Sequence, residues 1–248
     1  MVKIKEIYDY IDSFAPFSSA AGFDNSGLII GSKNKEIEKL IVCLDVTSEI
    51  IDEAKRIGAG LIISHHPVIF NPIKRIEENA IPYKAIENGI AILSAHTNID
   101  VCPVGTSALM CRLLGLENVE PIDEDGFLLM GELSSEKNED EFFCLVKSAF
   151  ETTVKAAPMK KNVKRVAVCA GSGGSFLDLA ISKGADALVT GDVKHDKFIS
   201  AVDRGVLLID AGHEATEIVY ISFLRELLEE QFPNIEIIEN TKRHVKFI

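Results

Sequence analysis

The chain has 248 residues, of which 47% are hydrophobic and 26% are charged. This composition is ordinary for a globular protein and excludes a disordered or fibrous chain, and the length provides a sizeable core for one large domain or two small ones. The formal net charge is −12 and no Lys/Arg-rich run offsets it, so the chain repels phosphate backbones and nucleic acid is excluded as a primary partner.

The cysteines and the start of the chain indicate the compartment. The five cysteines are odd in number, scattered and mostly within apolar stretches, which predicts reduced thiols in the core. Residues 1–12 form an amphipathic pattern instead of a signal peptide, and no apolar run is long enough to span a bilayer. We therefore expect a cytoplasmic protein with no membrane partner.

Apolar spacing in the first half predicts alternating helices and strands. Residues 3–14 form a helix that ends before Pro16, and a loop rich in Ser, Gly, Asp and Asn follows. Thr47 is the expected N-cap of a helix that ends at Gly58. Strands are predicted at 27–31, 39–45, 61–64 and 91–95, and further helices at 80–89 and 104–115.

The second half alternates in the same way. The stretch 117–125 is acidic and contains Pro121, so we place a boundary there, between one α/β half at residues 1–122 and another at 123–248. Strands are predicted at 127–133, 163–170, 187–190 and 206–210, and helices at 139–150, from Ser175, at 194–204 and at the end of the chain. The alternation predicts an α/β fold in which helices flank sheets with parallel neighbours.

The two halves contain a weak internal echo. In each half, a strand introduced by Gly-Ala ends in polar residues, and a second strand introduced by Gly ends in a motif with a histidine and a carboxylate. The motifs are GAGLIISHHP with NGIAILSAHTNID, and GADALVTGDVKHD with RGVLLIDAGHEATE. A duplication and a chance likeness between αβαβ segments both explain this pattern.

Residues that bind metals follow four predicted strands. Open α/β sheets bind ligands beyond the carboxyl ends of their strands. A single histidine is more often structural than a ligand, but only His244 of the six histidines lies outside these four strand ends, and this distribution favours one shared site. The groups at the strand ends are His65 with His66, His96 with Asp100, Asp192 with His195, and His213 with Glu217.

The spacing of these residues fits metal binding. Pro67 allows the chain to turn, so that both rings of the adjacent His65 and His66 reach a site. His213 and Glu217 are four residues apart and lie on one face of a helix. Together with Asp100, three imidazoles and two carboxylates suit Zn, Mn, Fe, Co or Ni. Five ligands exceed the needs of one catalytic ion and predict two divalent ions per chain.

Other motifs are weaker candidates. The run Gly171–Gly174 either presents amides to an anion or forms a tight turn. Ser64 and Ser94 lack a nucleophile elbow, which argues against a serine hydrolase. Asp45 either supports a ligand or caps the next helix, and we favour the cap. The acidic run at 136–141 is interpreted as a solvated helix start.

The ordered motifs DNSGLIIG, CLDVT, SHHP, AHTNID, TGD and DAGHEATE span nearly the whole chain, which resembles the GTP cyclohydrolase 1 type 2 homologues, also called the Nif-three-like family. The resemblance implies two related, interlinked α/β domains, a dinuclear metal site between them and a homohexameric ring. It implies the ligands His65, His66, Asp100, His213 and Glu217, with Glu217 as the bridge and His96 beside the site. Phe23 replaces a tryptophan that many relatives have, and the chain has no room for the inserted domain of longer relatives.

These residues predict metal-assisted hydrolysis of a nucleotide or small phosphate-containing molecule, in which His96 moves a proton. The family name does not establish the substrate, because fold and function are separable. A non-catalytic carrier of a metal or metal cofactor would use the same ligands, and the sequence leaves enzyme and carrier open.

Overall fold

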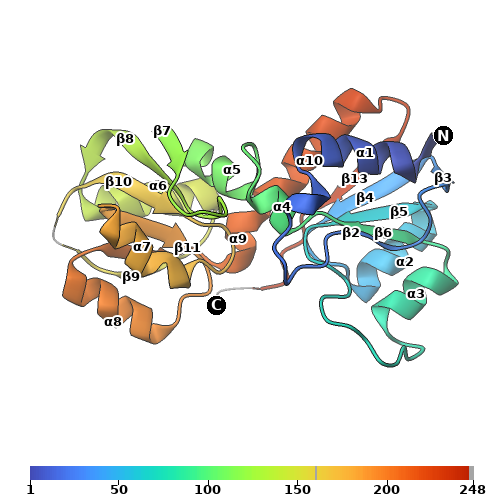
Figure 1. The fold of residues 1–248 in the computed structure, drawn as a ribbon, viewed down its shortest axis with the longest axis horizontal. Coiled ribbons are helices and arrows are strands. Elements are labelled where there is room, and N and C mark those ends of the chain that lie inside the picture. The colour runs from blue at the N-terminus through green and yellow to red at the C-terminus, as the bar shows by residue number, and fades with distance from the viewer. Residues whose placement is uncertain (160, 246–248) are drawn as a thin grey trace. The chain divides into compact units, whose positions relative to one another are not determined.

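The computed structural model in Figure 1 describes residues 1–159 and 161–245. It contains two compact units, and each unit is built from two separate stretches of the chain. Unit 1 comprises Met1–Cys102 and Tyr220–Lys242, and unit 2 comprises Pro103–Val219 and the described part of Arg243–Ile248. The sequence analysis divided the chain once, after residue 122, whereas the structural units exchange chain after Cys102, after Val219 and after Lys242.

Unit 1 is built on a five-stranded sheet with three parallel neighbour pairs and one antiparallel edge strand, β2. The strand order is β13 (Glu236–Asn240), β4 (Lys39–Cys43), β5 (Leu61–Ser64), β6 (Ala91–Ser94) and β2 (Gly27–Ile30). In Figure 1, α2 (Ser48–Ile57) and α3 (Ile81–Glu87) cover one face, and α1 (Ile4–Phe14) and α10 (Val219–Gln231) cover the other. A short pair, β1 (Val2–Lys3) with β3 (Glu36–Ile37), lies apart from this sheet.

Unit 2 is built on a six-stranded mixed sheet whose two faces have separate cores. The strand order is β7 (Leu116–Pro121), β8 (Leu129–Lys137), β10 (Val163–Val168), β11 (Ala187–Thr190), β12 (Leu207–Asp210) and β9 (Lys155–Ala157). Successive residues of a strand face opposite sides, so Val166 and Val168 join the core under α5 (Thr106–Leu113) and α6 (Glu139–Phe150). Ala167 joins the core under α7 (Leu177–Ser182) and α8 (His195–Arg204).

The predicted α/β class with mixed, partly parallel sheets is confirmed. The sequence analysis is wrong about the acidic stretch and about the end of the chain. The acidic stretch proposed as a boundary overlaps β7, and the final helix is divided into α9 (His213–Glu217) and α10 and followed by β13. The strands β7 and β13 lie at sheet edges and contain no buried residue, so they lack the apolar run that marks an interior strand. The short strands β1, β3 and β9 were also not predicted.

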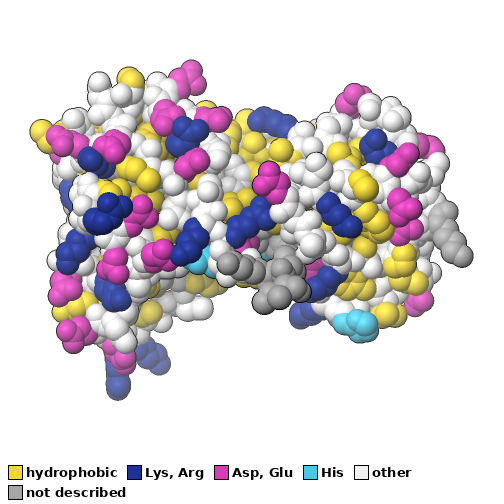
Figure 2. Space-filling view, turned by 180° about the vertical axis from the view of Figure 1, so that it is seen from behind, with side chains coloured by type: hydrophobic (Ala, Val, Ile, Leu, Met, Phe, Trp, Pro, Cys, Tyr) yellow, Lys and Arg dark blue, Asp and Glu magenta, His cyan; other side chains and the backbone are white. Residues whose placement is uncertain are grey.

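The charged surface, the helices and the cysteines can be compared with what the composition predicted. Figure 2 shows Lys and Arg side chains interspersed with Asp and Glu on the visible face of the molecule. No helix in the described ranges is long and apolar enough to cross a membrane. Cys43, Cys102, Cys111 and Cys169 are buried, as expected, but Cys144 is exposed, which corrects the prediction that all five lie in the core.

Candidate metal centre

The carboxyl ends of β5 and β6 gather three histidines within unit 1. Because these strands are parallel and pair Ser64 with Ser94, the residues that follow, His65-His66 and Ala95-His96, lie at the same edge of the sheet. The ring centroids are 5.2 Å apart for His65 and His66, 5.2 Å for His65 and His96, and 5.5 Å for His66 and His96. Each ring offers a nitrogen, and these three atoms lie within 4.8 Å of one another.

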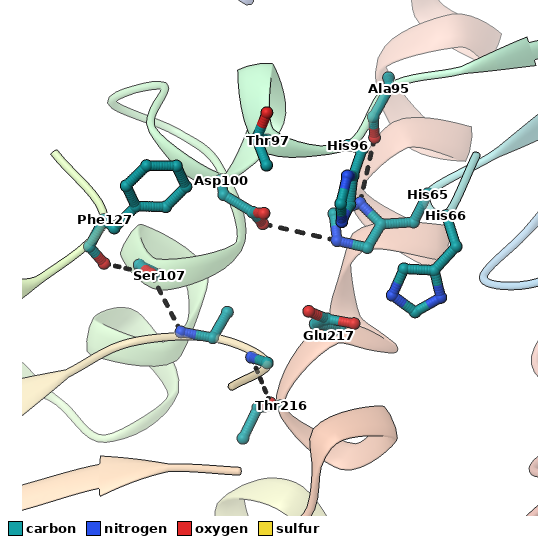
Figure 3. A network of polar contacts seen from close by, with 12 residues as sticks. His65, His66, Ala95, His96, Thr97, Asp100, Ser107, Phe127, Thr216 and Glu217 are labelled. Atoms are coloured by element: carbon teal, nitrogen blue, oxygen red, sulfur yellow. Dashed lines mark hydrogen bonds and ion pairs between the residues drawn. The ribbon is translucent and has the colours of Figure 1, made fainter. Parts of the chain in front are cut away.

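An oxygen atom orients each ring of this cluster. The Nδ1 atom of His65 lies 3.0 Å from the carbonyl oxygen of Ala95, and Figure 3 marks this contact with a dashed line. His66 Nδ1 lies 2.8 Å from Asp45 Oδ1, and His96 Nδ1 lies 2.8 Å from Asp24 Oδ1. A carbonyl or an ionised carboxylate only accepts hydrogen bonds, so each neutral ring donates through Nδ1 and keeps Nε2 as its ligand atom.

Asp100 adds a carboxylate to the cluster of unit 1. It is the last residue of α4 (Thr97–Asp100), a single turn that begins directly after His96. Its Oδ1 lies 3.5 Å from Nε2 of His65, and Figure 3 shows His65 between Ala95 and Asp100. The ring of Tyr220, which is fully buried, packs against His65 with centroids 4.9 Å apart. The predicted ligands His65, His66 and Asp100 therefore lie together.

In unit 2, α9 carries the pair His213 and Glu217. Nε2 of His213 lies 3.0 Å from Oε2 of Glu217, as expected for residues four apart on a helix. Nδ1 of His213 lies 2.7 Å from Oδ2 of Asp192. An oxygen atom therefore contacts Nδ1 of this ring, as it does in the three rings of unit 1. Burial acts to lower the pKa of His213, but the hydrogen bonds and charges of Glu217 and then Asp192 outweigh it and raise this pKa to about 9.

The glycine-rich loop after β10 packs against the Glu217 carboxylate. Gly171 has a φ of +61°, and a Cβ atom at this position would lie 2.3 Å from Oε1 of Glu217. The amide of Gly171 donates to Thr216 Oγ1 (3.0 Å), and that of Gly173 donates to Thr190 Oγ1 (2.7 Å). Because threonine hydroxyls accept from these two amides, neither is directed at an anion, and the loop serves as a tight turn that makes room for Glu217.

A small cavity in unit 2 adjoins the histidine of α9. Its volume is about 250 Å³, and His213 and Asp192 form part of its wall. Lys155 and Arg243 also line it, so it has two cationic side chains near the candidate ligand. The guanidinium of Arg243 donates to the backbone oxygens of Phe150 (3.0 Å) and Glu151 (2.8 Å), which hold it in place.

Some candidate residues behave differently from the sequence analysis. Asp45 contacts His66, while the side-chain cap of α2 is Thr47, so the preferred cap interpretation of Asp45 is wrong. His195 is an exposed residue at the start of α8 and belongs to none of the His/Asp/Glu groups found among the described residues. Asp24, whose partner His96 is 72 residues away, was not predicted as a site residue. The sequence pointed to Asp24 only as part of the DNSG motif and did not identify His96 as its partner.

The donor atoms fit a divalent transition metal. Oriented imidazole nitrogens combined with carboxylate oxygens are suited to ions such as Zn, Mn, Fe, Co and Ni. Carboxylates or carbonyls on the second ring nitrogen are the usual companions of ligand histidines. The described residues thus contain buried His and Glu groups that could hold a metal ion.

Comparisons with known proteins agree with this assignment of the fold. The chain is 32% identical over 246 residues to a GTP cyclohydrolase 1 type 2 homolog of Methanocaldococcus jannaschii, covering 96% of this chain and 98% of the relative. It is 29% identical over 256 residues to a GTP cyclohydrolase 1 type 2 of Helicobacter pylori, covering 100% of both. The crystal structure of Staphylococcus aureus hypothetical protein SA1388 superposes with a TM-score of 0.91 at 28% identity, covering 99% of each chain. Residues 2–244 match the description Duf34/NIF3 (NGG1p interacting factor 3), and the chain therefore belongs to this family.

Proposed function

We propose that the protein binds two divalent metal ions per chain and uses them to hydrolyse a nucleotide or a small phosphate-containing molecule. The proposed ligands are His65, His66 and Asp100 of unit 1 with His213 and Glu217 of unit 2, and Glu217 is the carboxylate that would serve both ions. One observation carries this proposal: an oxygen engages Nδ1 of every proposed histidine ligand, so that Nε2 is the atom presented for coordination.

The chemistry is divided between the ions and the chain. Bound divalent ions would supply Lewis-acid activation of water and of the scissile bond. His96 is oriented like the ligands and lies beside His65 and His66, and its Nε2 is suited to accept and return a proton. His213, whose pKa is raised, gives up its ring proton when it becomes a ligand.

Two features support a substrate with a planar base and a phosphate. Phe23 and Phe70 are 68% and 44% exposed, with ring centroids 6.3 Å apart, and Phe70 lies 6.2 Å from His96. Exposed aromatic rings beside a site are suited to stacking on a nucleobase. In unit 2, Lys155 and Arg243 line the cavity next to His213 and suit an anionic group. The name of the Helicobacter pylori relative is consistent with a nucleotide.

The rival function is that of a carrier for a metal ion or a metal cofactor. A carrier would use the same ligands without turnover, so it needs no proton acceptor. A variant that keeps its metal but loses turnover therefore indicates a hydrolase, because a carrier has no turnover to lose.

The test compares three alanine variants after metal loading. His96→Ala should keep both ions but lower turnover by about 10²-fold, because only the proton acceptor is removed. Glu217→Ala should abolish both metal binding and turnover, because two nearby cations would lose the carboxylate between them. His195→Ala is the matched control, since this exposed histidine lies outside the candidate groups, and it should change neither quantity.

The readouts are elemental analysis and hydrolysis of GTP, other nucleotides and small phosphoesters. If the fully loaded wild-type protein hydrolyses none of these, and His96→Ala changes only the binding of a metal complex or nucleotide, the hydrolase proposal fails and the carrier replaces it. A stoichiometry that stays near one ion per chain would contradict the two-ion proposal.

We also propose that the chain assembles as a homohexamer, as its resemblance to the family implies. Ile73 and Ile76, which are 47% and 48% exposed, belong to a segment of unit 1 without regular structure and are suited to burial between subunits. Light scattering should give a mass near six chains, and a stable monomer at micromolar concentration would contradict this proposal.

A further inference from the structure

Asp24 is a carboxylate outside the proposed ligand set, and its side chain has no exposed surface. Its Oδ1 accepts from His96 Nδ1 (2.8 Å) and from the amide of Asn25 (2.7 Å). Its Oδ2 accepts from Ser26 Oγ (2.6 Å), Thr97 Oγ1 (2.6 Å) and the amide of Thr97 (3.2 Å). A loop before β2 thus provides a carboxylate whose two oxygens are both held, and His96 is the only ring among these partners.

These contacts determine the protonation of the carboxylate. Burial acts to raise the pKa of Asp24, but the hydrogen bonds from His96, Ser26 and Thr97 outweigh it and hold this pKa below its ordinary value. An ionised carboxylate cannot donate, so the nitrogen that faces it must carry the proton. The opposite tautomer would place a lone pair of His96 against a negative charge.

The same loop also fixes the position of His96. Ser26 Oγ accepts from the backbone amide of His96 (3.3 Å), so the loop contacts both the backbone and the ring of this residue. The ring then lies against His65 and His66, with centroids 5.2 Å and 5.5 Å away. With Nδ1 directed at Asp24, Nε2 is the nitrogen that remains for chemistry on the side of the cluster.

Among the described residues, the Asp24–His96 pair differs from two other pairs in which a carboxylate contacts Nδ1 of a ring. Asp45, which contacts His66, is 47% exposed, and Asp192, which contacts His213, is 60% exposed. Water screens and competes for those two contacts, whereas Asp24 is excluded from water and forms further hydrogen bonds that fix its carboxylate plane. Among these three carboxylates, Asp24 therefore fixes the orientation of its histidine ring most strongly.

We propose that Asp24 is a positioning residue that fixes His96 as the Nδ1–H tautomer and directs Nε2 toward the His65–His66 pair, where it serves as the proton acceptor. Its effect on turnover rests on the proposed hydrolytic function. Its effect on tautomer and orientation does not, because both can be observed in metal-free protein.

The decisive experiment is ¹⁵N NMR of metal-free protein labelled at histidine, with the His96 signals assigned by their loss in His96→Gln. The wild-type protein should show His96 as a single Nδ1–H tautomer. Asp24→Asn keeps the shape but removes the charge, and it should give a mixture of tautomers. Asp45→Asn is the matched control, because its contact is with His66, and it should leave His96 unchanged. A wild-type Nε2–H tautomer, or an unchanged His96 in Asp24→Asn, would overturn the proposal.

A second variant covers the case in which Asp24→Asn does not fold, as judged by circular dichroism. Asp24→Ser replaces the carboxylate by a small hydroxyl that can still bond to the neighbouring Ser26 and Thr97 hydroxyls. Because the negative charge that faces Nδ1 of His96 is gone, this variant should also give a mixture of tautomers. A single Nδ1–H tautomer in Asp24→Ser would show that Asp24 does not set the state of His96.

Activity then tests the functional part in the metal-loaded protein. Asp24→Asn should keep the wild-type metal content and a KM within about twofold, but lower kcat by at least about tenfold toward the level of His96→Ala. The double variant should lose no more than His96→Ala alone, because the two residues act as one unit. A changed tautomer with unchanged kcat would overturn the proton-transfer role of Asp24. A wild-type protein without turnover would refute the hydrolase instead and leave the tautomer assignment standing.

Discussion

The orientation of single imidazole rings is the residue-scale feature that most strongly indicates metal binding. His65, His66, His96 and His213 each direct Nδ1 at an oxygen atom, although they come from two different units. A structural histidine needs no such uniform choice, whereas a ligand that coordinates through Nε2 does. The residue types of the site could be predicted from the sequence, but the use of each nitrogen could not.

The charge on His213 leads to a pH-dependent stability in the metal-free protein. Glu217 and Asp192 raise the pKa of His213 from 6.5 to about 9 against the effect of burial, so the folded chain binds this proton more tightly than the unfolded chain. The resulting stabilisation is fully present below pH 6.5 and is lost as the pH rises through about 9. Urea unfolding should show this fall in the free energy of unfolding. Glu217→Gln should flatten it, and an equally steep fall in that variant would contradict the assignment.

The contact between Gly171 and Glu217 predicts a selective effect on metal content. Gly171→Ala combines a left-handed φ of +61° with a Cβ atom 2.3 Å from Oε1 of Glu217, so the carboxylate must move. Gly205→Ala is a matched control with a φ of +65° and nothing within 4 Å of its new Cβ. Both variants should lose about 1–2 kcal/mol of stability through backbone strain.

Only Gly171→Ala should lower the metal stoichiometry, as measured by elemental analysis of the loaded proteins. An equal loss of metal in Gly205→Ala would mean that backbone strain, and not the displaced carboxylate, is responsible. Full metal binding in Gly171→Ala would show that Glu217 is not a ligand in the position it has here.

Secondary-structure elements explain which parts of the site were predictable. β4, β5, β6, β11 and β12 are buried on both faces apart from the first residue of β4, so each appears in the sequence as an apolar run whose end is easy to locate. The metal-type residues follow four of these ends, and the site could therefore be predicted. Asp24 and Asp45 could not be assigned partners, because pairs 72 and 21 residues apart are set by the packing of elements.

Two serines tie the ends of β5 and β6 together immediately before the histidines. Oγ of Ser64 lies 2.9 Å from Oγ of Ser94 and donates to the backbone oxygen of His66 (2.8 Å), and both side chains are fully buried. Ser64→Ala should lower the free energy of unfolding by about 1–3 kcal/mol, because buried polar groups lose a partner. Metal affinity should also fall, since the position of His66 is less fixed.

Ser182→Ala is the control for this prediction, because it removes an exposed hydroxyl that bonds within its own helix, at 2.8 Å from the oxygen of Leu179. It should change stability by less than about 0.5 kcal/mol and leave metal binding unchanged. Urea unfolding and metal titration measure the two effects. Equal behaviour of the two serine variants would remove the strand-end role assigned to Ser64.

At the scale of the whole molecule, the chain builds each unit from two stretches that are distant in sequence. β13 pairs in parallel with β4 over five residue pairs, from Glu236 with Lys39 to Asn240 with Cys43. A local sequence pattern cannot predict a pairing between strands that lie nearly a full chain length apart. The sequence therefore suggested a single boundary after residue 122. The acidic and proline-containing stretch that suggested it is the edge strand β7.

This organisation predicts how fragments of the chain behave. A fragment of residues 1–122 lacks β13 and α10, so β4 becomes an open edge and the sheet loses the buried side chains of Tyr220, Leu224 and Leu228. Open edges and uncovered apolar faces favour aggregation over folding. The fragment should show no cooperative thermal transition by circular dichroism.

The linked chain for comparison joins residues 1–102 to 220–242 by a Gly/Ser linker of about 20 residues. It contains the whole of unit 1 and should show a cooperative thermal transition. The same linked chain with Leu224→Asp should lose its transition, because the buried helix face cannot accommodate a charge. If residues 1–122 alone unfold cooperatively with the stability of the linked chain, the C-terminal segment is not required by unit 1, and the two-segment organisation does not describe how this protein folds.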